Sequence, residues 1–265
     1  KTFKRWKILP KIAYKIFKKF DLILTSNIES KDFFENLGGK NIYHFGNIKF
    51  LNRINFEEIK NQNENILSTK NFWCAASTHN NEEDFCVKTH IKVKKKIKNV
   101  LTIIIPRHIE RSEQIKKLCL NNRLKAQIIN KDDIIFNDTE IAIVNSFGVL
   151  PEYLKYARSA LIGKSLLKKF KKDGGQNPIL AAQMGCKIYH GPFISNFLDI
   201  YKFLNDKNFC KEIFSVDQLS DNLIHDFKAK KNNLDHSLEL FDKIAESISE
   251  KTFKKINNFL NYENL

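Results

Sequence analysis

Short β-rich runs alternate with helical patterns along most of this 265-residue chain, and this alternation restricts its fold more than any other feature. In the middle of the chain the runs are "FWCAAS" (72–77), "VLTIIIP" (100–106), "EIAIVN" (140–145) and "SALIG" (159–163). Strands that alternate with helices imply βαβ units, which build a parallel sheet with helices on both faces. The sequence therefore predicts a doubly wound α/β fold.

Apolar periodicity assigns a range to each expected element. Strands are expected at 21–26, 41–47, 72–77, 100–106, 126–130, 140–145, 159–163 and 187–191. Helices are expected at 28–38, 81–98, 109–122, 150–157, 177–184, 196–206 and 233–263. The stretch 51–70 is polar and weakly patterned, which makes it the best candidate for a linker.

The cysteines and the absent motifs exclude several classes of protein. Five cysteines are scattered along the chain without a CxxC pair, which argues against a disulfide framework and against a zinc site. The sequence contains no GxSxG, GxxxxGK[ST] or HExxH motif, so hydrolase, P-loop kinase and metalloprotease functions lack their residues. We expect a reducing, cytosolic setting, no bound metal and no cofactor.

The formal net charge of +15 is weak evidence for a nucleic-acid partner. Lys, Asn and Ile are abundant together, as a coding bias toward A and T would produce. No RNA-binding or helix-turn-helix signature accompanies the charge. We therefore expect no nucleic-acid partner.

Residues 1–20, "KTFKRWKILPKIAYKIFKKF", concentrate the charge, with eight Lys and Arg and no acidic residue. Aromatic and aliphatic side chains lie between these basic residues. A basic helix of this kind binds an anionic membrane surface. The alternative, held equally, is a helix with one buried face and one solvated face.

Polar side chains follow the strand expected at 72–77, at the edge where a parallel sheet binds its ligands. Ser77 and His79 stand in this loop as possible ligand contacts. Glu82, Glu83 and Asp84 follow in the first turn of the next helix, where acidic side chains complement the positive end of the helix dipole. For these acids we expect the capping role.

Pro106 and Arg107 follow the next strand along the chain. An arginine in a ligand-facing loop offers a planar, bidentate fork that suits a phosphate or a carboxylate. The alternative is a surface ion pair of Arg107 with Glu110 or Glu113.

The stretch "GGQNP" leads into the helix expected at 177–184. Gly174 and Gly175 allow positive φ and close backbone approach, and Pro178 at the first helical position leaves Asn177 as the N-cap. Free N–H groups and the helix dipole then form an anion site. An ordinary helix entry is the alternative, because many helices begin in this way.

Four motifs in this order resemble those of the 3-deoxy-D-manno-octulosonic acid (Kdo) transferases, which glycosylate lipid A in Gram-negative bacteria. They are "GNIKF" (46–50), "AASTH" (75–79), "PRHIER" (106–111) and "GGQNP" (174–178), the last followed by "GP" at 191–192. The resemblance covers about residues 1–207.

The resemblance implies a GT-B glycosyltransferase, in which two Rossmann-like domains face each other and the C-terminal one binds the donor, CMP-Kdo. Residues 1–50 would then end the N-terminal acceptor domain. Residues 51–265 would form the C-terminal nucleotide-sugar-binding domain, closed by the C-terminal helix. The implied activity is inverting transfer of Kdo to a lipid A precursor, lipid IVA, in lipopolysaccharide synthesis. The implied location is the cytoplasmic face of the bacterial inner membrane, as a peripheral protein.

The resemblance also implies roles for single residues. Lys49 matches a lysine that stabilises charge in the transition state. The residues that match contacts to CMP are Pro106, Arg107, Phe147, Gly148, Val149, Asn177, Pro178, Ile179 and Leu180. The family's general base, a glutamate of the N-terminal domain, has no counterpart in these residues, so we expect this chain alone to be inactive.

Two positions depart from the family pattern. Val149 stands where an acid is expected after Gly148, and Leu180 stands where a glutamate accepts ribose hydroxyl protons. Loss of such a bond costs about 1.5–3 kcal/mol. The departure at Leu180 favours a second hypothesis, a catalytically inactive, basic module that binds the membrane surface.

Overall fold

The structure is a computed structural model that describes the chain except for residues 1–5, 7, 53, 230–233 and 264–265. The chain forms two compact units. Unit 1 comprises Lys1–Arg53 and Glu239–Leu265, and unit 2 comprises Ile54–Leu238. The first break lies close to the expected boundary at residue 50, whereas the C-terminal segment joins unit 1 instead of closing the second domain.

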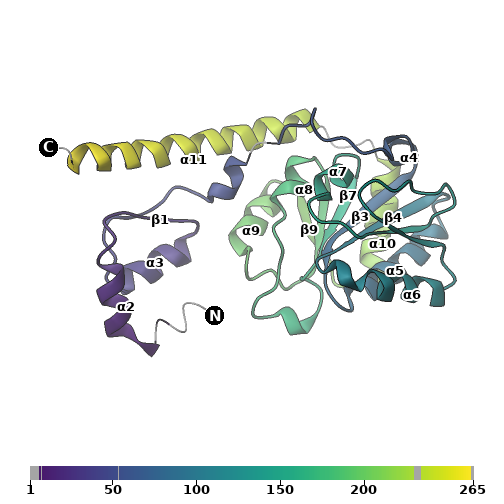
Figure 1. Cartoon of the computed structure of the whole chain (residues 1–265), viewed down its shortest axis with the longest axis horizontal. Helices are drawn as coiled ribbons and strands as arrows, with labels where there is room; N and C mark the ends of the chain where they lie inside the picture. The colour runs from purple at the N-terminus through teal and green to yellow at the C-terminus, as the bar shows by residue number, and fades with distance from the viewer. Residues whose placement is uncertain (1–5, 7, 53, 230–233, 264–265) are drawn as a thin grey trace. The chain divides into compact units, whose positions relative to one another are not determined.

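Unit 2 contains a sheet of seven parallel strands in the order β5-β6-β4-β3-β7-β8-β9 (Figure 1). The strands are β3 (Asn71–Thr78), β4 (Val100–Pro106), β5 (Ala126–Ile129), β6 (Ile141–Val144), β7 (Ser159–Ile162), β8 (Lys187–His190) and β9 (Cys210–Glu212). The α-helices are α4 (Glu64–Thr69), α5 (Glu82–Lys94), α6 (Ser112–Asn121), α7 (Leu150–Leu154), α8 (Ile179–Gln183), α9 (Leu198–Asp206) and α10 (Val216–Lys228). The predicted α/β fold with a parallel sheet is confirmed.

The central strands owe their position to continuous burial. Residues 72–76 of β3 and all of β4 are buried, so both faces of the sheet are covered at its centre. Such runs are typical of parallel strands between helices. Trp73, at the centre of this core, is fully buried.

The direction of the crossovers reverses between β3 and β7. From β3 the chain crosses to β4 on one side, and from β7 it crosses to β8 on the other. In open α/β sheets this switch point leaves a crevice beyond the carboxyl ends of the strands, where ligands bind. The loops after β3 and β7 therefore define the place to look for a site.

Unit 1 holds a two-stranded parallel sheet, and most of α11 packs into it. Its elements are α2 (Pro10–Phe17), β1 (Ile23–Thr25), α3 (Ile28–Asn36), β2 (Ile42–His44), the 3-10 helix η1 (Ile48–Leu51) and α11 (Leu234–Glu263). The ring of Phe241 in α11 stacks on Phe50 of η1 with centroids 5.9 Å apart. A Cβ on Gly46 would lie 2.6 Å from Ile248, so the glycine allows α11 to approach. These contacts explain why the last helix belongs to unit 1.

Two α-helices and one strand of unit 2 were not expected. The helix α4 lies inside the expected linker, and β9 and α10 lie in a region without an expected element. Among the described residues, none of the helices is long and apolar enough to cross a membrane.

Candidate functional site

Backbone hydrogen bonds join the loops at the carboxyl ends of β3, β4 and β7. The Arg107 N–H donates to the Thr78 carbonyl at 2.9 Å, and the Gly163 N–H donates to the Ala76 carbonyl at 2.8 Å. A Cβ on Gly163 would lie 2.4 Å from the Ser77 carbonyl oxygen, so only glycine permits this approach. Ser77 has a φ of +55° at a register shift in β3. The edge at the switch point is thus tightly built from main chain.

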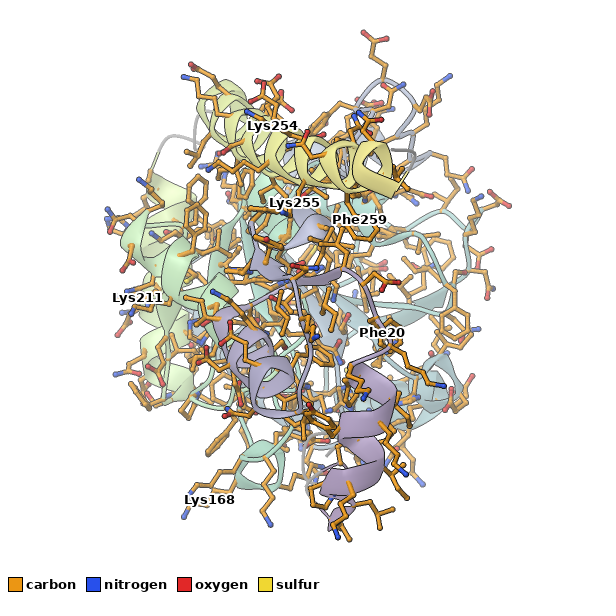
Figure 2. The ribbon with its side chains drawn as sticks, turned by 90° about the vertical axis from the view of Figure 1, so that its left-hand side faces the viewer. Phe20, Lys168, Lys211, Lys254, Lys255 and Phe259 are labelled. Atoms are coloured by element: carbon orange, nitrogen blue, oxygen red, sulfur yellow. The ribbon has the colours of Figure 1, made fainter. Side chains whose placement is uncertain are left out.

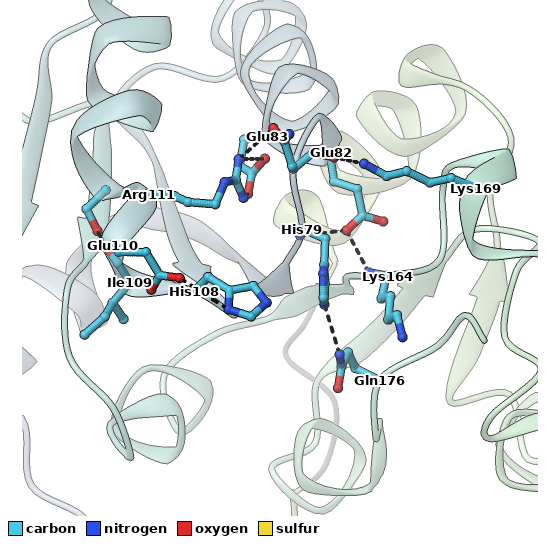
Figure 3. A network of polar contacts seen from close by, with 12 residues as sticks. His79, Glu82, Glu83, His108, Ile109, Glu110, Arg111, Lys164, Lys169 and Gln176 are labelled. Atoms are coloured by element: carbon cyan, nitrogen blue, oxygen red, sulfur yellow. Dashed lines mark hydrogen bonds and ion pairs between the residues drawn. The ribbon is translucent and has the colours of Figure 1, made fainter. Parts of the chain in front are cut away.

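The carboxylate of Glu82 holds two of these loops together (Figure 3). This side chain is fully buried and accepts four backbone N–H groups. Oε2 accepts from His79 and Lys164 at 2.9 and 2.7 Å, and Oε1 accepts from Ser165 and Leu166 at 2.9 and 3.0 Å. Burial raises the pKa of Glu82, and the four N–H groups limit the rise because they favour the charged form. Glu82 therefore does more than the capping role expected from the sequence.

The neighbouring acid, Glu83, fixes the other side of the same loop. Arg111 donates from Nη1 to Glu83 Oε1 at 2.7 Å and from Nη2 to Oε2 at 3.0 Å. The same Nη2 donates to Asn80 Oδ1 at 3.2 Å. Because Glu83 is only 1% exposed, this bidentate pair is structural and leaves Arg111 with little capacity for a ligand.

Arg107 is placed differently. Its side chain is exposed, and among the described residues its guanidinium makes no hydrogen bond or ion pair. The alternative pairing with Glu110 or Glu113 is not formed; instead His108 lies 3.5 Å from Glu110. Arg107 therefore keeps its donors available beside the switch point, as the sequence predicts for a phosphate ligand.

His79 is half-buried at the centre of this edge. Its ring lies edge-on to His108 and to Phe170, each with centroids 5.5 Å apart. Its Nε2 lies 3.1 Å from Gln176 Nε2, so the amide donates to the imidazole in this arrangement. Burial, followed by the charges of Lys164 and His108, lowers the pKa of His79 to about 4. The imidazole is consequently neutral near pH 7.

Gly174 and Gly175 bring the segment before α8 against the loop after β8. Both residues are buried, and a Cβ on Gly174 would lie 2.2 Å from the Phe193 carbonyl oxygen. Gly175 has a φ of +88° and donates its N–H to the Lys164 carbonyl at 2.7 Å. Asn196 donates its N–H to the Gly174 carbonyl at 2.9 Å. The two glycines thus serve loop packing in the first place.

The helix entry begins one residue later than expected. Helix α8 starts at Ile179, with Pro178 as its N-cap residue, and Asn177 Oδ1 accepts from the Ile179 N–H at 3.1 Å. Asn177 is exposed, Ile179 is buried and Leu180 is half-buried. The helix has only five residues, so its dipole adds less than that of the helix expected over 177–184.

The turn after β6 presents one residue outward. Phe147 is 70% exposed, and Gly148 has a φ of +80° with open space around it. Val149 is 2% exposed and is the N-cap residue of α7. At Val149 and Ile179, therefore, only main-chain atoms are offered to a ligand.

Lys49 lies in unit 1 and is exposed on the 3-10 helix η1. Asn47 begins this turn and accepts the Lys49 N–H through its side-chain oxygen at 3.0 Å. The sequence suggests a strand end here, but β2 already ends at His44.

Sequence reasoning missed two side chains of the switch-point edge. Lys164 lies two residues after the end of β7 and pairs with Asp173 at 3.2 Å, and Gln176 contacts His79. The position after a buried strand, which identified Arg107, is the signal that identifies Lys164 as well. Thr78 Oγ1 is buried at the same edge and has no hydrogen-bond partner among the described residues.

No metal centre is evident at this edge. Within the part of the chain that the structure describes, no group of three or more His, Cys, Asp and Glu side chains could hold a metal ion. Unit 1 has a cavity of about 220 Å³, which is lined by Leu24, Thr25, Ser26, Ser30, Phe34, Phe45, Gly46, Ile48 and Thr252.

Sequence comparison finds relatives among the curated proteins. A 3-deoxy-D-manno-octulosonic acid transferase from Rickettsia bellii is 30% identical over 222 residues, which are 83% of this chain and 52% of that protein. The chain therefore spans about half the length of the curated relatives it matches. No protein-family model matches the sequence.

Solved structures share the fold. The C-terminal CMP-Kdo binding domain of WaaA from Acinetobacter baumannii superposes with a TM-score of 0.57 at 20% identity, over 71% of this chain and 93% of that domain. The Anabaena protein HepE, in complex with UDP and glucose, gives a TM-score of 0.55 at 8% identity, over 94% of this chain and 66% of that protein. These neighbours confirm the predicted GT-B fold class.

Proposed function

We propose that this chain, a homologue of the 3-deoxy-D-manno-octulosonic acid transferases, supplies the donor-binding part of a glycosyltransferase that transfers Kdo from CMP-Kdo. The acceptor in this proposal is a lipid A precursor in lipopolysaccharide synthesis. The names of the homologues support the activity, and the exposed Arg107 supports a donor site at the switch point. The second hypothesis, a module that only binds the membrane surface, predicts no nucleotide affinity.

The observation that carries the proposal is the uncommitted Arg107 at the switch point. Two arginines follow β4, and Arg111 is held by Glu83 while Arg107 is exposed beside Thr78 and His79. An exposed guanidinium at the ligand-binding edge of an α/β sheet suits the phosphate of a nucleotide sugar.

In the proposed reaction a general base takes the proton of an acceptor hydroxyl, whose oxygen attacks the anomeric carbon of Kdo with inversion. The bond between that carbon and the phosphate oxygen breaks, and CMP leaves. Negative charge then grows on the leaving phosphate. Cations fixed in advance lower the energy of such a transition state because they need no reorganisation. Within unit 2, Arg107 supplies this role. We assign the reaction to the cytoplasmic face of the inner membrane.

Leu180 weakens the proposed ribose site without removing the phosphate site. The half-buried isobutyl group cannot accept a ribose hydroxyl. We therefore expect CMP to bind this chain, but about tenfold to a hundredfold more weakly than it binds relatives with a glutamate there.

Isothermal titration with CMP tests the proposal. The whole chain should bind CMP, and Arg107→Met should weaken binding about tenfold to a hundredfold, because a charge-assisted bond to phosphate is lost. Arg123→Met is the matched control: Arg123 is also exposed but lies at the turn after α6, away from the loop after β4. A folded chain without measurable affinity at millimolar CMP would exclude the proposal.

We also propose that α2 rests on an anionic membrane surface. Ala13 is its only buried residue, while Ile12 and Ile16 are exposed among lysines. Phe20, just beyond the helix, keeps 51% of its surface exposed (Figure 2). Exposed apolar side chains beside basic ones are typical of interfacial helices.

Co-sedimentation with vesicles tests this second proposal. Binding should increase with the content of anionic lipid, decrease with salt, and weaken in an Ile12→Ser, Phe20→Ser double variant. Lys117→Ser with Leu120→Ser on α6 removes one basic and one apolar exposed side chain elsewhere and serves as the control. Equal loss in both pairs would contradict a role for α2.

A further inference from the structure

We propose that His79 takes up a proton when a cytidine nucleotide binds, and that the resulting imidazolium contacts the phosphate. In this step Gln176 turns its amide from donor to acceptor. The proton comes from solvent and leaves again with the nucleotide. The inference rests on the proposed function, because it concerns the same donor site.

The pair formed by His79 and Gln176 has two arrangements. In the present one, Gln176 Nε2 lies 3.1 Å from His79 Nε2, and the amide donates to a neutral imidazole. An imidazolium carries a proton on both nitrogens and accepts nothing. A half-turn of the amide presents Oε1 instead, so the same contact persists after protonation. The main chain of Gln176 stays in place during this turn, because its carbonyl accepts from the Tyr201 hydroxyl at 3.0 Å.

Basic side chains surround His79 from two loops. Arg107 and His108 face it from the loop after β4, and Lys164 faces it from the loop after β7. Without an anion, burial and then the neighbouring basic groups hold the imidazole neutral, and the pKa of His79 is about 4.

The acidic side chains of the neighbouring helix α5 offset only part of the positive charge around His79. Glu83 favours the charged imidazole, but this carboxylate is paired with Arg111. The Glu82 carboxylate is occupied by four backbone N–H groups, one of them from His79 itself. The site is therefore short of negative charge at His79.

A bound phosphate supplies the missing negative charge. An anion placed between Arg107 and His79 favours the imidazolium, because an opposite charge within a few ångströms stabilises the charged form. The imidazolium then donates a charge-assisted hydrogen bond, which is about twice as strong as a neutral one. Binding and protonation reinforce each other, and the affinity should rise as the pH falls.

Calorimetry in buffers of different ionisation enthalpy measures the proton uptake. The ligand is the methyl ester of CMP, a phosphodiester like the donor, because CMP itself has a phosphate that titrates near pH 6. Near pH 6 we expect uptake of about one proton per ligand bound. The affinity should strengthen by up to about tenfold per pH unit as the pH falls below 7.

Three variants assign the proton. His79→Asn should abolish the uptake and weaken binding about tenfold. Gln176→Glu places a carboxylate beside the ring, so His79 should already be protonated in the free protein and the uptake should fall. Imidazole nitrogen shifts in NMR spectra would show this directly. His225→Asn is the control, because His225 is an exposed histidine of α10. The proton uptake of this variant should equal that of the unsubstituted protein.

The outcomes separate the inference from the proposed function. Binding of the ester without proton uptake overturns the inference and leaves the donor site standing. Uptake that survives His79→Asn and disappears in His108→Asn assigns the proton to His108 and also overturns it. Absence of any nucleotide affinity in a folded chain refutes the proposed function itself. If His79→Asn does not fold, the Gln176→Glu result decides.

Discussion

Two neighbouring regions of unit 2 build the same edge by different means. The charge-built region comprises the loops after β3 and β4, the first turn of α5 and residues 163–166. The buried carboxylate of Glu82 joins the loop after β3 to residues 163–166. The shape-built region comprises residues 173–180, where Gly174 and Gly175 pack on the main chain of the loop after β8.

The comparison shows which groups are left for a ligand. In the charge-built region the side chains of Glu82, Glu83 and Arg111 form hydrogen bonds and ion pairs within the protein. Arg107 and His79 are therefore the side chains that can contact a ligand. In the shape-built region the two glycines are required for the close packing of the loops. A residue that looks functional in the sequence can therefore be the support of a functional neighbour.

Removal of one oxygen at Glu82 should produce the largest effect. In Glu82→Gln an amide nitrogen replaces one oxygen, and two of the four backbone N–H groups lose their acceptor inside the protein. Each unsatisfied group costs about 1–3 kcal/mol, so the free energy of unfolding should fall by about 2–6 kcal/mol. Urea denaturation measures it. Asp84→Asn, on the half-buried side chain in the same turn, is the control and should change little. A loss below about 1 kcal/mol would contradict the charge-built description.

A methyl group tests the shape-built region. In Gly174→Ala the new Cβ meets main-chain oxygens of Phe193 and Phe170 at 2.2 and 2.7 Å, so the loops must separate. Overpacking of this kind costs about 3 kcal/mol. Gly148→Ala is the matched control, because its φ of +80° is strained but nothing lies within 4 Å.

This control should lose about 1 kcal/mol, which is the strain of a left-handed alanine alone. Chemical denaturation compares the two variants directly. Gly174 does not have a positive φ, so a loss no larger than that of the control would contradict the packing of Gly174 on the loop after β8.

A lower pH should decrease the stability of the protein through α5, the helix that supports the charge-built region. His90 lies on α5, the helix that carries Glu82, and is fully buried with Nδ1 2.9 Å from Thr102 Oγ1. Burial lowers the pKa of His90 from 6.5 to about 4. The unfolded chain therefore binds this proton first, and stability decreases as the pH falls from 6.5 toward 4.

Because of this histidine alone, the free energy of unfolding should be about 2 kcal/mol lower at pH 5 than at pH 7. Urea denaturation at both pH values gives the difference, and His90→Gln should reduce it. The pKa of His79 is lowered as well, so part of the pH dependence of stability should remain in His90→Gln. An unchanged difference in His90→Gln would mean that other groups carry the acid sensitivity.

The sequence predicts the fold well because burial in a parallel sheet leaves a strong local signal. Continuous apolar runs located β3, β4, β6 and β7 within about two residues at either end. The strand β9 has only one buried residue, Cys210, and gave no such signal. Helix α10 begins with a cap, where Ser215 accepts the Gln218 N–H at 3.2 Å, and this pattern of Ser and Gln three residues apart was readable.

Side-chain roles were harder to predict than positions. The sequence identifies Arg107 because its position directly after a buried strand is enough to place it at the ligand-binding edge of the sheet. It does not identify the roles of Glu82 and Arg111, because their partners are backbone groups and side chains about 30 to 80 residues away in the sequence. The join of α11 to unit 1 depends on contacts such as that of Phe50 with Phe241, which no local pattern reveals.

The smallest effect concerns Leu180, the residue of the shape-built region that departs from the family pattern. Leu180 is half-buried at the start of α8, one residue after the N–H group that Asn177 accepts. A carboxylate at this position, in Leu180→Glu, should accept a ribose hydroxyl and strengthen CMP binding about tenfold. Titration of the ribose analogue 2′,3′-dideoxy-CMP separates this bond from a general charge effect, because that ligand should gain nothing. Leu180→Met, which conserves volume without a charge, should leave both affinities unchanged. If Leu180→Glu does not distinguish the two nucleotides, α8 does not face the ribose, and the phosphate contacts of the charge-built region alone hold the donor.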